Sequence, residues 1–244
     1  MWFANTLREW CEQTGRRFNE MIGTAGDPYL QKDEPFKWPA SHLKGEEKDW
    51  EVVLTQRAYS LAGMRDVRFS HMIRDPRDMV VSGQRYHKWC HEKWAKVPKR
   101  EFDWRSYQHV LRDLDNEEGL LFELEYFGRM STLAMWKWPY YGDPRCLNLR
   151  YEDVIYQPKQ MFRKLFEHYG LGDVEKGVEC ALKHSFESRS GRRLGEEKEG
   201  DHYRKGTPND WKIRFTPTVV AEFKRQFGQA LIDLGYEKDF SWGV

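Results

Sequence analysis

Side chains that could bind a phosphate group gather in the stretch RDPRDMVVS, which begins at Arg74 and ends at Ser82. Ser82 follows Asp78 by four residues, so the two share one face if the stretch is helical. An arginine, a hydroxyl group and a helix N-terminus together form a compact phosphate site. The alternative is a capped helix whose surface carries salt bridges among Arg74, Asp75, Arg77 and Asp78. The stretch alone does not decide between these two interpretations.

A second candidate for anion binding is HYRKGTPNDWKIRFTP at residues 202–217, which has too many turn-forming residues for a helix. Arg204 and Lys205 stand beside Gly206, whose missing side chain lets backbone N–H groups approach an anion closely. On charge alone, a solvated and mobile surface loop would be the favoured interpretation. Trp211 argues against that alternative, because a tryptophan beside a basic turn indicates an ordered loop.

Alternating strands and helices are predicted to position these two stretches. VRFSHMI at residues 67–73 is a short apolar run typical of a buried strand, and it leads into a helix with Asp75 as N-cap and Pro76 in the first turn. RCLNLRYEDV predicts a second strand, and the helix PKQMFRKLFEHYGL follows it with Pro158 near its start. Arg74 would then lie at the carboxyl edge of a strand, where open α/β sheets bind ligands.

The remaining segments are mostly predicted as helices. Helical spacing predicts one helix at the start of the chain and a second one further along. The apolar face of that second helix would consist of Trp50, Val53, Leu54, Ala58 and Leu61. Residues 23–49 are predicted as a long loop, residues 103–138 as one or two amphipathic helices, and a short helix should end near Lys183. TPTVVAEFKRQFGQALIDLGY predicts a closing helix.

The alternation of strands and helices predicts an α/β fold with a parallel sheet flanked by helices on both faces. A chain of 244 residues is long enough for one sizeable core, so we expect residues 1–244 to form a single domain.

The charges nearly balance, with 40 basic and 39 acidic residues and a net charge of +1. No global field therefore draws the chain to nucleic acid or to an anionic membrane, and any anion site must be local. No apolar run approaches membrane-spanning length, and the first residues lack the pattern of a signal peptide. Four scattered cysteines without a CxxC pair are typical of reduced cysteines, so we expect a cytoplasmic protein.

Three segments, RDPRDMVVS, LRYEDV and RKGTPNDWKIRFTP, together resemble the signature segments of sulfotransferases that use 3'-phosphoadenosine 5'-phosphosulfate as donor. They come in that family's order, and the resemblance runs from about residue 35 to the C-terminus. It implies a P-loop nucleotide-kinase-like fold. It also implies that Arg74 and Ser82 hold the donor's 3'-phosphate from one side, while the Arg-Lys-Gly loop beginning at Arg204 folds over it from the other.

The resemblance assigns roles to three further residues. Tyr151, in LRYED, matches a tyrosine that contacts the adenine, and Phe186, in HSFES, matches an aromatic residue that packs against it. His42, in KWPASHLKG, resembles the histidine of the family's Lys-Thr-His-Leu segment, which acts as general base. Its imidazole suits that work because the ordinary histidine pKa lies near neutral pH. The chain departs from the family's spacing here, since Lys37 lies five residues before the histidine.

The N-terminus departs further from the family pattern. Sulfotransferases begin with a strand and a Lys-Ser-Gly-Thr-Thr-Trp loop that binds the 5'-phosphosulfate, and Trp2 resembles the final tryptophan, which stacks on adenine. By this resemblance, we expect the first strand and the phosphate loop to be missing from this sequence. We expect a truncated reading frame or chain, and the alternative is a protein that lacks this loop.

The sequence HKWCH could place His87, Cys90 and His91 on one helical face, as zinc ligands would require. No fourth ligand stands at a typical spacing. We therefore interpret this segment as a helix surface near the acceptor site.

The leading hypothesis is a sulfotransferase in which His42 takes a proton from an acceptor hydroxyl while that oxygen attacks sulfur in line. The acceptor would be a small molecule or a glycan, and no metal is implied. One alternative is a catalytically impaired nucleotide-binding protein, because the 5'-phosphosulfate loop is absent. A nucleotide or sugar kinase is disfavoured, since GxxxxGK[ST] does not occur. The sequence does not determine the acceptor or the oligomeric state.

Overall fold

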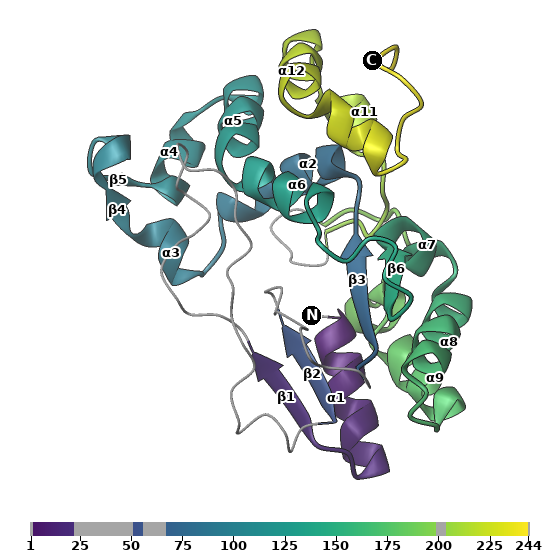
Figure 1. Ribbon diagram of the computed structural model, residues 1–244. Helices are drawn as coiled ribbons and strands as arrows, with labels where there is room; N and C mark the ends of the chain where they lie inside the picture. Colours follow the sequence, from purple (N-terminus) through teal and green to yellow (C-terminus); the bar gives the residue numbers. More distant parts are fainter. Residues whose placement is uncertain (1, 22–50, 56–66, 199–203, 244) are drawn as a thin grey trace. The chain divides into compact units, whose positions relative to one another are not determined.

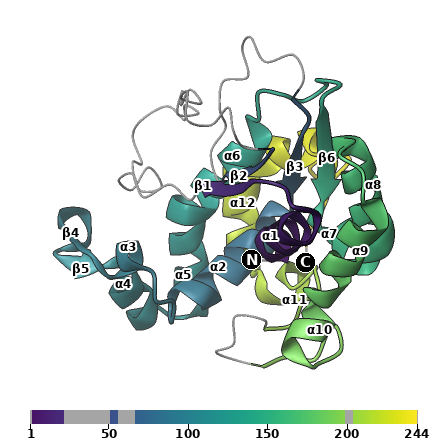
Figure 2. The ribbon, with the colours of Figure 1, turned by 90° about the horizontal axis from the view of Figure 1, so that it is seen from below.

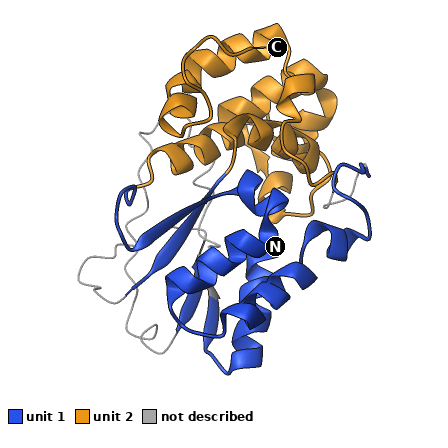
Figure 3. Ribbon diagram, turned by 90° about the vertical axis from the view of Figure 1, so that its right-hand side faces the viewer, with its two compact units in different colours: residues 1–25, 37–73, 139–198 blue, residues 26–36, 74–138, 199–244 orange. Residues whose placement is uncertain are grey.

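The computed structural model describes residues 2–21, 51–55, 67–198 and 204–243 (Figure 1). The chain forms two compact units, each made of segments that are distant in sequence (Figure 3). The first unit contains residues 1–25, 37–73 and 139–198, and the second contains residues 26–36, 74–138 and 199–244. None of the helices in the described part of the chain has the length and apolar content that crossing a membrane requires.

The first unit contains two pairs of parallel strands. The first pair joins β1 (Phe18–Met21) to β2 (Val52–Thr55), and the second joins β3 (Phe69–Ile73) to β6 (Cys146–Arg150). In the second pair the register sets Phe69 opposite Cys146. Both β3 and β6 lie where the sequence predicts strands, and their parallel pairing agrees with the predicted sheet.

Helices cover the strands of the first unit. They are α1 (Trp2–Thr14), α7 (Tyr151–Tyr156), α8 (Pro158–Tyr169), α9 (Val174–Lys183) and α10 (Phe186–Ser190). Helix α8 begins with a proline in its first turn and ends at Gly170, whose φ of 68° closes the helix in the left-handed conformation. Helices α8 and α9 lie side by side next to β6 (Figures 1 and 2). The core of the first unit contains the buried side chains of Trp10, Leu149, Phe162 and Phe166.

One predicted helix in the first unit is wrong. Helical spacing through Val53 and Leu54 predicts a helix, yet residues 52–55 form strand β2, which pairs with β1. A short apolar run with two adjacent valines carries no reliable period, and β-branched side chains favour strands. Residues 22–50, predicted as a loop, and residues 56–66 lie outside the described part of the chain.

The second unit consists mainly of helices. Its longer helices are α2 (Pro76–His87), α4 (Tyr107–Asp113), α5 (Asn116–Glu123), α6 (Arg129–Trp136) and α12 (Pro217–Asp233). A π-helical turn, η4 (Leu124–Gly128), joins α5 to α6 without a break. The predicted helical region at residues 103–138 therefore contains α4 and a continuous segment that begins with α5.

Short elements complete the second unit. They are α3 (Lys93–Lys96), β4 (Pro98–Lys99), the 3-10 turn η3 (Arg100–Phe102), β5 (Arg105–Ser106) and α11 (Trp211–Arg214). Strands β4 and β5 form an antiparallel hairpin that lies with α3 and α4 (Figures 1 and 2).

The hydrophobic core of the second unit lies between α2, α5, α11 and α12. Val80, Leu120 and Phe223 are fully buried there, and Trp211 and Trp242 pack in the same cluster. Local signals explain the longest helix, because the Thr216 hydroxyl accepts the N–H of Val219 and Pro217 occupies the first turn. The sequence predicts this helix from the same residues.

Candidate functional site

The N-terminus of α2 has the cap that the sequence predicts. Asp75 Oδ1 accepts the backbone N–H of Arg77 at 2.9 Å, and Pro76 occupies the first helical position. Both residues are suited to these places, since an aspartate satisfies a free N–H group and a proline has none to leave unsatisfied.

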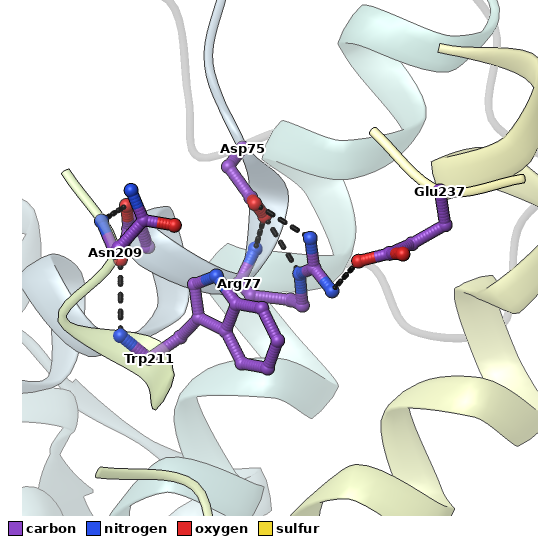
Figure 4. A network of polar contacts seen from close by, with 6 residues as sticks. Asp75, Arg77, Asn209, Trp211 and Glu237 are labelled. Carbon is purple, nitrogen blue, oxygen red and sulfur yellow. Dashed lines mark hydrogen bonds and ion pairs between the residues drawn. The ribbon is translucent and has the colours of Figure 1, made fainter. Parts of the chain in front are cut away.

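Arg77 is buried at this end of α2, with 3% of its side chain exposed. Its guanidinium donates to both carboxylate oxygens of Asp75, at 3.0 and 2.8 Å, and to Glu237 Oε1 at 2.5 Å (Figure 4). The guanidinium carbon also lies 3.7 Å from the ring centroid of Trp211 and 4.7 Å from that of Trp242. The interpretation of this pair as a surface salt bridge is therefore wrong. The aromatic rings and the two carboxylates replace the water that an arginine loses on burial.

Asp78 connects α2 to the segment at residues 204–211, called the basic loop below, through two hydrogen bonds. Its carboxylate accepts the backbone N–H of Asn209 at 2.5 Å and that of Trp211 at 3.1 Å, and the residue is 1% exposed. The loop turns sharply at this point, since Asn209 has a φ of 74°. Burial raises the pKa of Asp78, while the two backbone hydrogen bonds and the charge of Arg74 oppose that rise.

Asp210 holds the two cations of the loop. Lys205 Nζ donates to Asp210 Oδ1 at 2.6 Å, and the Arg204 guanidinium donates to Oδ2. The Asp210 side chain is 5% exposed, whereas the side chains of Arg204 and Lys205 keep 18% and 24% exposure. Burial alone would raise the pKa of Asp210, but the hydrogen bonds and charges of the two cations outweigh it and lower that pKa. The two cations therefore form a single charged cluster with the carboxylate.

Arg74, Ser82 and Gly206 belong to the same unit as this cluster. Arg74 directly follows β3 and lies close enough to Asp78 for its charge to act on that carboxylate. Ser82 is partly buried on α2, one turn beyond Asp78. Gly206 has a φ of 74°, a conformation that side chains disfavour, so a glycine suits the turn after the two cations. The second unit thus contains the Ser82 hydroxyl on α2, the cation of Arg74 just before α2, and the basic loop. The basic loop supplies two more cations and a tight turn at Gly206.

The residues with a predicted adenine contact lie in the first unit. Trp2 is half-buried, its indole N–H donates to the carbonyl oxygen of Ala181 at 2.7 Å, and its ring packs on Phe162. Tyr151 is the first residue of α7 and is half-buried. Phe186 is the first residue of α10 and is 6% exposed, with the guanidinium carbon of Arg192 at 5.4 Å from its ring centroid. The predicted base, His42, lies outside the described residues.

The structure corrects the interpretation of HKWCH as a helix surface. Helix α2 ends at His87, which is 2% exposed, and Cys90 is 4% exposed, so only His91 of the three is on the surface. The buried imidazole of His87 has a polar partner, since its Nδ1 lies 3.0 Å from a carboxylate oxygen of the fully buried Glu123. Among the described residues, no three His, Cys, Asp or Glu side chains lie close enough together to hold a metal ion.

Sequence reasoning missed two residues that organise the basic loop. Asp78 is predicted only as part of the helix start, and Asp210 is assigned no role. The signal for Asp210 is weak but present, since an acid stands in an otherwise basic stretch, five residues after Lys205. Arg77 was also missed as a buried residue, because its partners Glu237 and Trp242 lie far along the chain.

Comparisons with known proteins point to one family. The family model described as the sulfotransferase domain matches residues 64–235. The structure resembles mouse sulfotransferase SULT7A1 complexed with PAP, with a TM-score of 0.50 and 15% identity over 94% of this chain and 78% of that one. Two structures of retinol dehydratase, one with androsterone and inactive cofactor PAP and one with retinol and PAP, match with a TM-score of 0.47 and 19% identity. These matches cover 78% of this chain and 55% of the retinol dehydratase chain. No curated protein sequence matches.

Proposed function

Because this chain belongs to the sulfotransferase family, we propose that it moves a sulfuryl group from 3'-phosphoadenosine 5'-phosphosulfate to a hydroxyl group of an acceptor. The fold of the described residues agrees with that family, since parallel strands are covered by helices as in the mouse sulfotransferase.

One observation carries the proposal furthest. The carboxylate of Asp78 binds two backbone N–H groups of the basic loop and so holds that loop on α2. Arg204 and Lys205 on the loop, with Arg74 just before α2 and Ser82 within it, would bind the donor's 3'-phosphate. Several hydrogen-bond donors on one rigid framework bind a phosphate more strongly than separate surface cations, because less side-chain freedom is lost.

The proposed chemistry needs few reacting groups in the protein. The acceptor oxygen attacks sulfur in line, the bond from sulfur to the bridging phosphate oxygen breaks, and 3'-phosphoadenosine 5'-phosphate leaves. His42 would take the proton of the acceptor hydroxyl. The contacts of Trp2, Tyr151 and Phe186 with adenine remain predictions of the family resemblance. The acceptor would be a small molecule or a glycan.

The donor site can be tested by a thermal-shift titration with 3'-phosphoadenosine 5'-phosphate, using 5'-AMP as the control ligand. At a hundred times its dissociation constant a ligand stabilises the native state by about 2.7 kcal/mol, which raises the melting midpoint by a few degrees. We expect this shift for the bisphosphate and none for 5'-AMP, since only the bisphosphate carries the 3'-phosphate. Equal shifts for both nucleotides would contradict the assigned phosphate site.

A matched pair of variants locates the site. Lys205→Met should weaken bisphosphate binding by about tenfold, because a hydrogen bond between two charged groups contributes about 1.5–3 kcal/mol. Lys212→Met removes the same charge from an exposed position on α11, and it should have little effect. Equal losses in both variants would indicate general electrostatic attraction instead of a site.

Turnover is tested separately, with donor labelled by ³⁵S and a panel of phenol, steroid and sugar acceptors. His42→Ala should abolish most transfer while it leaves bisphosphate binding unchanged. Bisphosphate binding without any transfer would instead favour the nucleotide-binding protein that does not catalyse.

A further inference from the structure

We propose that Asp210 is a positioning residue, which holds Arg204 and Lys205 ready for the donor's 3'-phosphate. The inference rests on the proposed function and extends it to a residue that does not itself touch the phosphate.

The contacts of Asp210 show why the three side chains form one unit. Each carboxylate oxygen binds one cation, with Lys205 Nζ at 2.6 Å from Oδ1 and the Arg204 guanidinium on Oδ2. The carboxylate is 5% exposed, and a carboxylate removed from water requires compensating charge or hydrogen bonds. Both cations of the cluster come from the loop that would receive the phosphate. Displacing either cation would therefore leave a buried negative charge poorly compensated.

The backbone around Asp210 is held just as firmly. The N–H groups of its two neighbours, Asn209 and Trp211, both donate to Asp78 on α2. The Trp211 ring lies against the guanidinium of Arg77, at 3.7 Å from ring centroid to guanidinium carbon. Asp210 thus stands on a fixed section of chain, and its carboxylate can transfer that rigidity to two long, flexible side chains.

A phosphate that binds this cluster meets cations that are already in place. Ordering a free lysine or arginine on binding opposes affinity, and a residue that orders them beforehand removes that cost. The cations also keep 18% and 24% exposure, which Asp210 does not. We infer that Asp210 binds the inner side of each cation and that the phosphate approaches from the exposed side.

Charge alone predicts the opposite effect from positioning. Asp210 is negative, so its removal would raise the positive potential at the site and strengthen phosphate binding. If Asp210 acts by positioning, its removal weakens binding. The sign of the change in affinity therefore separates the two roles.

The test is calorimetric titration of 3'-phosphoadenosine 5'-phosphate into the unsubstituted chain and into Asp210→Asn. We expect about a tenfold loss of affinity, on the scale of the cost of ordering side chains. Asp233→Asn is the matched control, because Asp233 also accepts hydrogen bonds from neighbouring side chains in the same unit. It should bind like the original chain. Unchanged or tighter binding by Asp210→Asn would overturn the inference.

A second comparison asks whether Asp210 acts through the cations. In the background of Lys205→Met, the additional loss from Asp210→Asn should shrink, because one of the two positioned groups is gone. An undiminished loss would overturn the inference.

Two further controls separate a folding defect, or a failure of the proposed donor site, from the loss of affinity expected for Asp210→Asn. Circular dichroism reports whether Asp210→Asn folds, and Asp210→Glu serves as a second variant that keeps the charge but moves the carboxylate by one methylene. We expect Asp210→Glu to lose affinity several-fold as well, since geometry and not charge is altered, and full affinity would overturn the inference. If the unsubstituted chain fails to bind the bisphosphate, the proposed donor site is wrong. Normal binding by both variants would instead overturn the role of Asp210 alone.

Discussion

The two ends of α2 each carry a buried network of charged and polar side chains, and they differ in what encloses them. At the N-terminal end, Asp78 binds the backbone of a loop, and the loop's cations keep part of their surface exposed. At the C-terminal end, the carboxylate of the fully buried Glu123 accepts the Tyr107 hydroxyl at 2.8 Å and contacts His87 Nδ1 at 3.0 Å.

Aromatic rings close the C-terminal network. The imidazole of His87 meets the rings of Trp94, Tyr107 and Phe127 edge-on, with centroids 4.5–5.7 Å apart. A buried carboxylate therefore does not by itself indicate a binding site. The C-terminal network contributes to the core, whereas the cations of the N-terminal network stay partly exposed, as the proposed phosphate site requires.

The largest expected effect is on stability, at the closed end. Glu123→Ala should lower the free energy of unfolding by about 3–5 kcal/mol, because it leaves a buried histidine and a tyrosine hydroxyl without their shared acceptor. Urea unfolding measures the change. Glu123→Gln keeps an acceptor and should lose less. A cost below about 1 kcal/mol for the alanine variant, or a loss of nucleotide affinity in the folded glutamine variant, would remove the distinction between the two ends.

A smaller effect is expected at the open end. Arg77→Lys keeps the charge but loses the paired contact with Asp75 and the stacking on Trp211, so unfolding should become easier by about 2 kcal/mol. Unfolding followed by tryptophan fluorescence reports the change. Arg225→Lys is the control, since Arg225 forms an exposed pair with Glu222 and its replacement should leave the free energy of unfolding nearly unchanged. Similar costs for the two variants would mean that burial of Arg77 contributes nothing extra.

The smallest effect is a pair of opposite pH dependences. Burial raises the pKa of Asp78 above its ordinary 3.8. The folded chain therefore protonates Asp78 at a higher pH than the unfolded chain does, so the contribution of Asp78 to stability increases as pH falls toward 3.8. Burial alone would raise the pKa of Asp210 as well, but hydrogen bonds from Lys205 and Arg204 lower it. Its stabilisation is therefore complete above 3.8 and is lost as pH falls through the lower folded-state pKa.

Unfolding midpoints measured from about pH 6 to about pH 2.5 can separate these two contributions. Asp78→Asn should remove the gain on mild acidification, and Asp210→Asn should remove part of the loss at lower pH. If both variants change the profile in the same direction, the assigned environments of the two carboxylates are wrong.

Much of the fold could be predicted because its signals are local. Strands β3 and β6 are short and mostly apolar segments that each run directly into a helix start, and α2, α8 and α12 each begin with a proline in the first turn. Strand β2 could not be predicted from the spacing of its apolar residues, since four residues show no reliable period and the pairing with β1 joins distant parts of the chain. The division into two units was likewise out of reach, because each unit combines segments from distant parts of the chain.

The candidate site was predictable in its components and not in its connections. Arg74, Ser82, Arg204 and Lys205 stand out by type and spacing. The role of Asp210 depends on a loop that reverses at Gly206 and Asn209, both with positive φ, and sequence spacing does not reveal which side chains such a loop brings together.

The π-helical turn η4 sets the rotational phase of the helix that follows it. A π turn holds one more residue than an α turn, and each helical residue advances the direction of its side chain by about 100°. The buried side chains of α6, Thr132 and Met135 among them, keep their inward direction because the wider turn takes up the extra residue within itself. A single-residue deletion within residues 124–128 would therefore convert the wider turn into an α turn and leave this buried face in place, whereas the same deletion inside α6 would rotate the residues beyond it by about 100°.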